Sequence, residues 1–171
     1  ITFIRSTKFY PQEFVWPISA FRRLLSDLLH ERLRIENSLC YGLKIHAELR
    51  QNFSEFLMNV KTEEKNIEIV EKEFWRTVNE IADGAHKERF ELIKSLGVDQ
   101  LRSQELMTED IADTAVRRIS MRDGKINTLQ EDLEQMRNVS HDEVVSLAKE
   151  VFDPEYVFTE IILPSKKPEK L

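Results

Sequence analysis

Two side chains in the first third of the sequence have the chemistry to donate hydrogen bonds to a carbonyl group or a developing oxyanion: Arg34 and Tyr41, seven residues apart. A guanidinium offers a fixed fork of N–H donors, and a phenol hydroxyl can donate to a carbonyl or a developing oxyanion. They lie in the stretch LHERLRIENSLCYG, residues 29–42. Its pattern predicts the end of an amphipathic helix, a polar turn and the start of a strand. Both side chains would then project from one edge of the domain toward a facing domain.

This stretch resembles a motif in the second half of the insulinase-like (pitrilysin-type, inverted-zincin) metallopeptidases. The helix end, the Arg, the Leu two residues before the Tyr and the Tyr itself match in spacing. The resemblance implies that Arg34 and Tyr41 bind substrate carbonyls near the scissile bond, across from a zinc-bearing catalytic half. The residues alone leave another interpretation open. Arg34 would then be a solvated cation at a helix end, and Tyr41 would be a core residue on the apolar face of the strand.

The sequence contains no recognisable catalytic or metal site. Family members bind zinc through H-x-x-E-H on a helix, and the four histidines here have no partner His three or four residues away: His30, His46, His86 and His141. G-x-S-x-G and a Gly-rich phosphate loop are also missing, and Cys40 falls inside a predicted strand. We therefore expect no catalytic, cofactor-binding or metal residues in this chain, which should be inactive alone, with zinc in the partner half.

Composition limits the function classes further. The 171 residues are 41% hydrophobic and 33% charged, which is typical of a globular domain with a sizeable core. A net charge of −6 argues against a nucleic-acid partner. No apolar run approaches the roughly 20 residues of a membrane span, and one cysteine excludes an internal disulfide. These observations favour a soluble protein of the cytoplasm or periplasm.

Hydrophobic periodicity predicts a strand, a helix and a hairpin in the first part of the chain. Residues 1–9 should form a strand, and Pro11 and Pro17 should bracket the connection to a helix that begins at Ile18 and ends at Asn37-Ser38. The next strand alternates with period two. Its covered face would carry Leu39, Tyr41, Leu43, Ile45, Ala47 and Leu49, and its other face Cys40, Gly42, Lys44, His46, Glu48 and Arg50. A turn at Gln51-Asn52 would lead to an antiparallel strand over residues 53–61.

The second part of the chain predicts a block of helices and one closing strand. Thr62 should cap a helix whose apolar stripe is Ile67, Val70, Phe74, Val78 and Ile81, and Gly84 should end it. Further helices are expected over residues 85–107 with an interruption at Gly97, over residues 108–123, around residues 129–136, and from a capping box at Ser140 to Val151. A strand over residues 156–163 would close the domain.

The order of these elements indicates an α+β fold. We expect an antiparallel or mixed sheet of about four or more strands, covered on one face by several helices, as in a single domain of the insulinase-like metallopeptidases. Residues 1–163 would be one non-catalytic domain and residues 164–171 a polar tail. The expected function is to complete the peptide-binding cleft of a zinc endopeptidase, with the zinc-bearing domain or subunit and a peptide as partners. The alternatives are a structural or assembly domain of the same fold and an unrelated α+β interaction domain.

Overall fold

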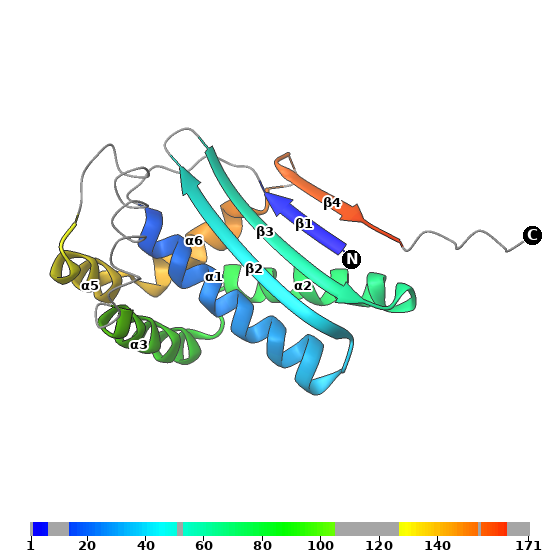
Figure 1. Cartoon of the computed structure of the whole chain (residues 1–171), viewed down its shortest axis with the longest axis horizontal. Helices are drawn as coiled ribbons and strands as arrows, with labels where there is room; N and C mark the ends of the chain where they lie inside the picture. The colour runs from blue at the N-terminus through cyan, green and yellow to red at the C-terminus, as the bar shows by residue number, and fades with distance from the viewer. Residues whose placement is uncertain (1, 7–13, 51–52, 105–126, 154, 164–171) are drawn as a thin grey trace, which may run out of the picture.

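The computed structural model describes residues 2–6, 14–50, 53–104, 127–153 and 155–163, which form an α+β arrangement (Figure 1). The strands are β1 (Thr2–Ser6), β2 (Cys40–Arg50), β3 (Phe53–Thr62) and β4 (Val157–Ile161). The α-helices are α1 (Val15–His30), α2 (Ile67–Ala82), α3 (Lys87–Gln104), α5 (Leu129–Asn138) and α6 (His141–Val151). A π-helical turn, Glu31–Glu36, follows α1, and a 3₁₀ turn, Glu64–Asn66, precedes α2.

The strands pair in the order β2-β3-β1-β4, and every neighbouring pair is antiparallel. In β3, Phe56, Met58 and Val60 are at most 4% exposed, whereas Leu57 and Asn59 between them are only half-buried. The helices therefore cover one face of the sheet, and Figure 1 shows them on the same side of it. The predicted α+β class is confirmed.

Aromatic side chains from four parts of the chain join the sheet to the helices. Phe21 of α1 and Phe56 of β3 have ring centroids 5.4 Å apart, and Phe152 after α6 lies 5.2 Å from Phe56. Phe74 of α2 completes the cluster at 5.0 Å from Phe152. The two pairs that involve Phe152 are edge-to-face, and such pairs stabilise a core by roughly 0.5–1.5 kcal/mol each beyond their burial. This cluster fixes α1 and α2, the two helices that border the candidate site, against the sheet.

The helix predicted to begin at Ile18 begins at Val15, so that prediction was wrong at its start. Pro17 lies in the first turn of α1, where a residue has no carbonyl partner four positions earlier and the missing N–H of proline costs nothing. The end of the helix was predicted well, since the π-helical turn stops at Glu36 and Ser38 has a left-handed φ of 50°.

The predicted faces of β2 are wrong at its first residues. Cys40 pairs with Thr62 and Gly42 with Lys61, which leaves Tyr41 as the extra residue of a β-bulge. The bulge reverses the alternation, so Cys40 is buried and Tyr41 is 70% exposed. Beyond the bulge the prediction holds, because Ile45 and Leu49 are buried whereas Lys44 and His46 are exposed.

Two further details of the helical block differ from the sequence prediction. Thr62 does not cap α2; it is the last residue of β3, and its hydroxyl donates to the carbonyl oxygen of Leu39. Gly97 does not interrupt α3 but lies inside it, where a Cβ would stand 2.7 Å from Cε of Met136. The small size of Gly97 therefore allows α3 and α5 to approach closely, and this glycine does not break α3.

The predicted capping box at Ser140 is confirmed, and α5 lies where a short helix was expected. Gly84, with a φ of 84°, follows the end of α2 as predicted. The predicted helix over residues 108–123, the turn at Gln51-Asn52 and the tail over residues 164–171 lie outside the described residues.

Candidate functional site

The candidate site is the junction where α1 passes into β2. Leu33, in the π-helical turn, is fully buried and anchors this turn in the core, so the following residue, Arg34, points to solvent. The chain then reverses through Ser38, and the backbone N–H of Leu39 donates to the carbonyl oxygen of Leu33 at 2.7 Å. This hydrogen bond joins the residue before Arg34 to the residue two before Tyr41. Both candidate side chains therefore emerge from one closed turn.

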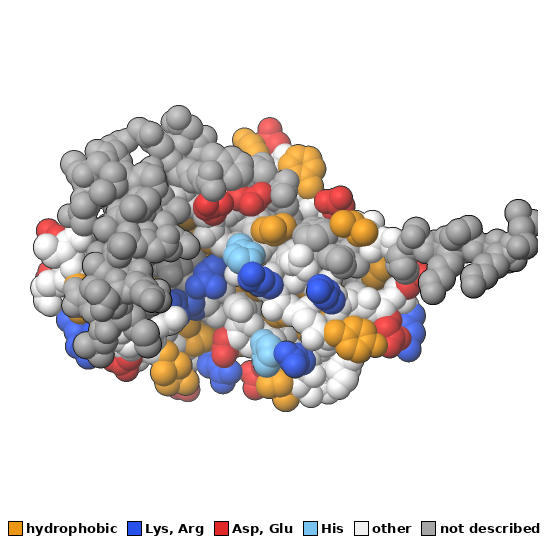
Figure 2. Space-filling model, in the orientation of Figure 1, with side chains coloured by type: hydrophobic (Ala, Val, Ile, Leu, Met, Phe, Trp, Pro, Cys, Tyr) orange, Lys and Arg blue, Asp and Glu red, His pale blue; other side chains and the backbone are white. Residues whose placement is uncertain are grey.

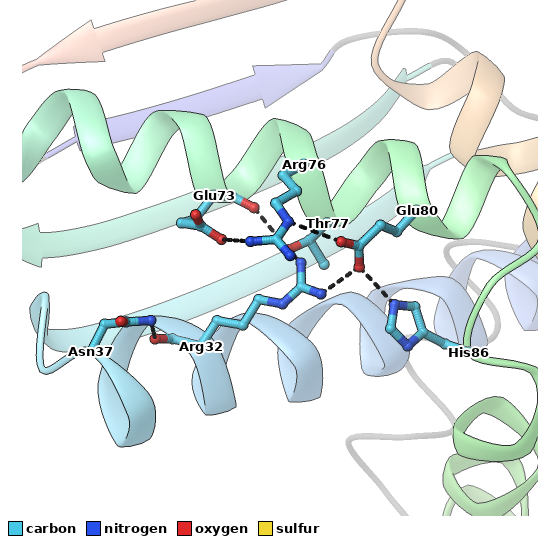
Figure 3. A network of polar contacts seen from close by, with 7 residues as sticks. All are labelled: Arg32, Asn37, Glu73, Arg76, Thr77, Glu80 and His86. Carbon is cyan, nitrogen blue, oxygen red and sulfur yellow. Dashed lines mark hydrogen bonds and ion pairs between the residues drawn. The ribbon is translucent and has the colours of Figure 1, made fainter.

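A polar network holds the π-helical turn against α2 (Figure 3). The Arg32 guanidinium donates to the Thr77 hydroxyl at 2.9 Å and forms an ion pair with Glu80. Glu80 also accepts from Arg76 at 3.0 Å and lies 2.9 Å from Nε2 of His86. The carbonyl oxygen of Arg32 accepts from the Asn37 side chain, which closes the turn from its other end. Arg32 therefore ties the segment that carries Arg34 to a neighbouring helix.

The charge of Glu80 is stabilised by these donors. Partial burial raises the pKa of the Glu80 carboxyl, but hydrogen bonds from Arg32, His86 and Arg76 outweigh it and lower the pKa to about 2. Glu80 is therefore ionised at every physiological pH, and the network keeps its anionic centre.

Arg34 itself has no such anchor. Its side chain is exposed, and within the described part of the chain its guanidinium makes no hydrogen bond or ion pair. The charge of Arg34 affects the pKa of the neighbouring Cys40 thiol. Burial raises this pKa, and the positive charge of Arg34 opposes the rise. The five N–H donors of Arg34 are thus available to an incoming acceptor.

The Tyr41 hydroxyl donates to Oε1 of Glu63 at 2.7 Å, and Oε2 of Glu63 lies 2.7 Å from Nζ of Lys65. The hydrogen bond to Glu63 raises the pKa of Tyr41, so the phenol keeps its proton. Lys65 first, and Tyr41 second, lower the pKa of the Glu63 carboxyl, which stays ionised. The bulge at Tyr41 turns its ring outward, so the prediction that this ring is buried with Leu43 and Ile45 is wrong.

Sequence reasoning missed the residues that support this pair. Glu63 and Lys65 meet Tyr41 because β2 and β3 are antiparallel and Cys40 pairs with Thr62, so the predicted hairpin was the available signal. The contact between Arg32 and Glu80 spans 48 residues and two helices, and no local pattern indicates it.

The described residues contain no group of three or more His, Cys, Asp or Glu side chains that could hold a metal ion. These described residues therefore do not fit a zinc site, and no zinc chemistry is assigned to them. Among the described helices, none is long and apolar enough to cross a membrane.

Comparison with known proteins identifies the fold. Neither a family model nor a curated protein sequence matches the chain. Solved structures do match. A protease from Helicobacter pylori gives a TM-score of 0.80 at 17% identity, over 92% of this chain and 39% of that one. An inactive domain of an insulinase-type peptidase from Pseudomonas fluorescens gives 0.74 at 12% identity, over 92% of this chain and 39% of that one.

The inactive peptidase domain of a candidate zinc protease from Bordetella parapertussis gives a TM-score of 0.74 at 10% identity, over 99% of this chain and 94% of that domain. The chain has the fold of an insulinase-family peptidase domain. The resemblance suggested by the stretch around Arg34 and Tyr41 is thereby confirmed at the level of the fold. The chain spans only 18% to 41% of the longer neighbours, and the neighbours include domains described as inactive.

Proposed function

We propose that residues 1–163 are the non-catalytic half of a zinc-dependent endopeptidase and that Arg34 and Tyr41 hold the carbonyl groups of a bound peptide. The partner would be a domain or subunit that carries H-x-x-E-H and the zinc ion. This chain would close the cleft from the opposite side.

The exposed guanidinium of Arg34 carries this proposal. An exposed arginine with no acceptor among the described residues does little for the stability of its own domain, yet it emerges from a turn that is anchored by a buried leucine and by the ion pair of Arg32. Ligand binding is favoured when the segment that carries the donor group, here the π-helical turn, is held rigidly by its surroundings. The Tyr41 hydroxyl, on the same junction, would exchange Glu63 for a substrate carbonyl when a peptide arrives.

The test uses the longer protein or assembly that contains this chain and a zinc motif. Arg34→Ala and Tyr41→Phe should each lower peptidase turnover by about 100-fold or more, since loss of one donor to a developing oxyanion costs roughly 3–4 kcal/mol of barrier. Thermal unfolding should change little, because both groups are exposed and make few contacts.

Arg137→Ala and Tyr156→Phe are matched controls, since both residues are exposed and lie away from the junction, Arg137 in α5 and Tyr156 in the turn before β4. Neither control should change turnover. If Tyr41→Phe leaves activity intact but unfolds the domain, the hydroxyl is a structural partner of Glu63 and the substrate role is refuted.

One observation favours the second candidate, a structural or assembly domain of the same fold. The single proton of the Tyr41 hydroxyl is already donated to Glu63, and that carboxylate is bridged to Lys65. Absence of H-x-x-E-H from both the full-length protein and its partner subunits would select this candidate. The proposed grip on substrate would then be withdrawn.

A further inference from the structure

A groove of about 320 Å³ lies between the first half of α1 and the second half of β2. Its walls include Val15, Ile18, Ile45 and Leu49, which are apolar, and Ser19 and Arg22, which are polar. Pockets that bind ligands share this character of apolar walls with a few polar groups. Arg34 and Tyr41 belong to the other end of β2 and do not line the groove. The proposed roles of Arg34 and Tyr41 therefore do not account for the groove.

One wall of the groove is an edge of β2 with which no described strand pairs. In the described sheet β2 pairs only with β3, so its other edge has no neighbouring strand. Nη1 of Arg22 reaches the carbonyl oxygen of Ile45 at 3.5 Å, at the outer limit of a hydrogen bond. A carbonyl that meets a side chain of α1 points away from β3. In an antiparallel strand the N–H and C=O of one residue point the same way, so alternate residues from Leu43 to Leu49 offer both groups along this edge.

The groove contains a positive charge at Arg22. Arg22 is half-buried, and no carboxylate pairs with it among the residues that the structure describes. Burial first, and then the charge of Arg23, lower the pKa of Arg22, which shows that its environment disfavours a cation. His46 also lines the groove, Lys44 is exposed on the same strand, and Figure 2 shows Lys, Arg and His side chains in the middle of the view with Asp and Glu side chains next to them. An anionic ligand would offset the charge of Arg22.

We propose that the groove binds an extended peptide, which adds as a strand to the free edge of β2 and places a carboxylate on Arg22. The main chain of the peptide would pair with the backbone of alternate residues from Leu43 to Leu49, as in other cases of strand addition. An Asp or Glu side chain would form the bidentate pair that a guanidinium prefers. The apolar walls would take the neighbouring side chains. The site is independent of the proposed roles of Arg34 and Tyr41.

Fluorescence anisotropy with short acetylated and amidated peptides tests the proposal. The first peptide alternates valine and threonine around a central glutamate, and the second replaces that glutamate with glutamine. The chain should bind the glutamate peptide about tenfold or more tightly than the glutamine peptide, because a hydrogen bond to a charged group is among the stronger ones. In the Arg22→Gln variant this preference should disappear. The matched control is Arg23→Gln, which changes a half-buried neighbour whose guanidinium binds Gln100 at 2.7 Å and does not line the groove.

Strand addition also predicts that binding depends on the backbone N–H groups of the peptide, which contacts between side chains alone would not require. N-methylation of the peptide at alternate positions should abolish binding in one register and leave it nearly unchanged in the other, because only one set of N–H groups faces β2. Equal effects in both registers would overturn strand addition. Equal binding of the glutamate and glutamine peptides to the unaltered chain would overturn the role of Arg22, even if Arg22→Gln fails to fold. If instead the chain dimerises, binds neither peptide and becomes monomeric in Arg22→Gln, a second copy occupies the groove and the proposal is wrong.

Discussion

Neutralising Glu80 should remove a pH-dependent part of the folding free energy. Glu80 accepts from Arg32, Arg76 and His86, and although partial burial raises its pKa, these bonds lower it from 4.5 to about 2. At 1.36 kcal/mol for each pKa unit, the difference corresponds to a ceiling of about 3 kcal/mol. Because 28% of the Glu80 side chain remains exposed, solvent screening reduces this ceiling, and we expect a contribution of about 1–2 kcal/mol.

The direction with pH follows from the lowered pKa. The carboxylate is stabilised in the folded state, so its contribution is fully present above pH 4.5 and is lost as the pH falls toward about 2. Urea unfolding near neutral pH and at about pH 3 measures the loss. The unaltered chain should lose about 1 kcal/mol more stability between these conditions than the Glu80→Gln variant, since the variant has no charge to lose at this position.

Glu91→Gln is the control for this measurement. Glu91 also forms an ion pair, with Lys94 at 2.8 Å, but half of its side chain is exposed, so its removal should barely change the pH dependence. If Glu80→Gln and the unaltered chain lose equal stability between the two pH values, the network does not hold Glu80 ionised. Arg32 would then not anchor the π-helical turn through a charge.

Three further predictions concern the fold. Ile45→Ala should cost about 2–5 kcal/mol in chemical denaturation because Ile45 is 4% exposed, whereas Lys44→Ala should cost well under 1 kcal/mol; equal costs would show that the faces of β2 are misassigned. Ser140→Ala removes the capping box of α6 and should lower the free energy of unfolding by about 0.5–2 kcal/mol in the same assay. Gly97→Val should cost about 1–3 kcal/mol by overpacking, since a Cβ there lies 2.7 Å from Cε of Met136, and an unchanged melting temperature would refute this close contact.

Local patterns in the sequence predicted the elements whose structure depends on local chemistry. The capping box at Ser140 needs only residues 140–143, and it forms as expected. The apolar stripe of α2 follows from helical spacing, and Val70, Phe74, Val78 and Ile81 are buried. The α+β class followed from the order of these elements.

The features that escaped prediction depend on distant partners. The bulge at Tyr41 is a property of two paired strands, since it appears only as a mismatch between Cys40–Gly42 and Thr62–Lys61. A single strand with period two gives no sign of it. Arg32 likewise looks like any other charged residue near a helix end until α2 brings Glu80 beside it. Long-range pairing therefore decided which side chains reach solvent at the junction.

The exposure of the candidate pair depends on two departures from regular structure in one short segment. The π-helical turn carries Arg34, and the β-bulge turns Tyr41 outward; regular structure at the second site would have placed the ring of Tyr41 with Ile45 against the helices. Each irregularity gives up regular hydrogen bonds, and Ser38 between them adopts a left-handed conformation that a residue with a Cβ disfavours. Irregularities of both kinds are common at functional sites. Their coincidence between residues 31 and 42, over a buried Leu33 and an ion-paired Arg32, supports the proposal that this junction holds a substrate, which the Arg34 and Tyr41 variants test.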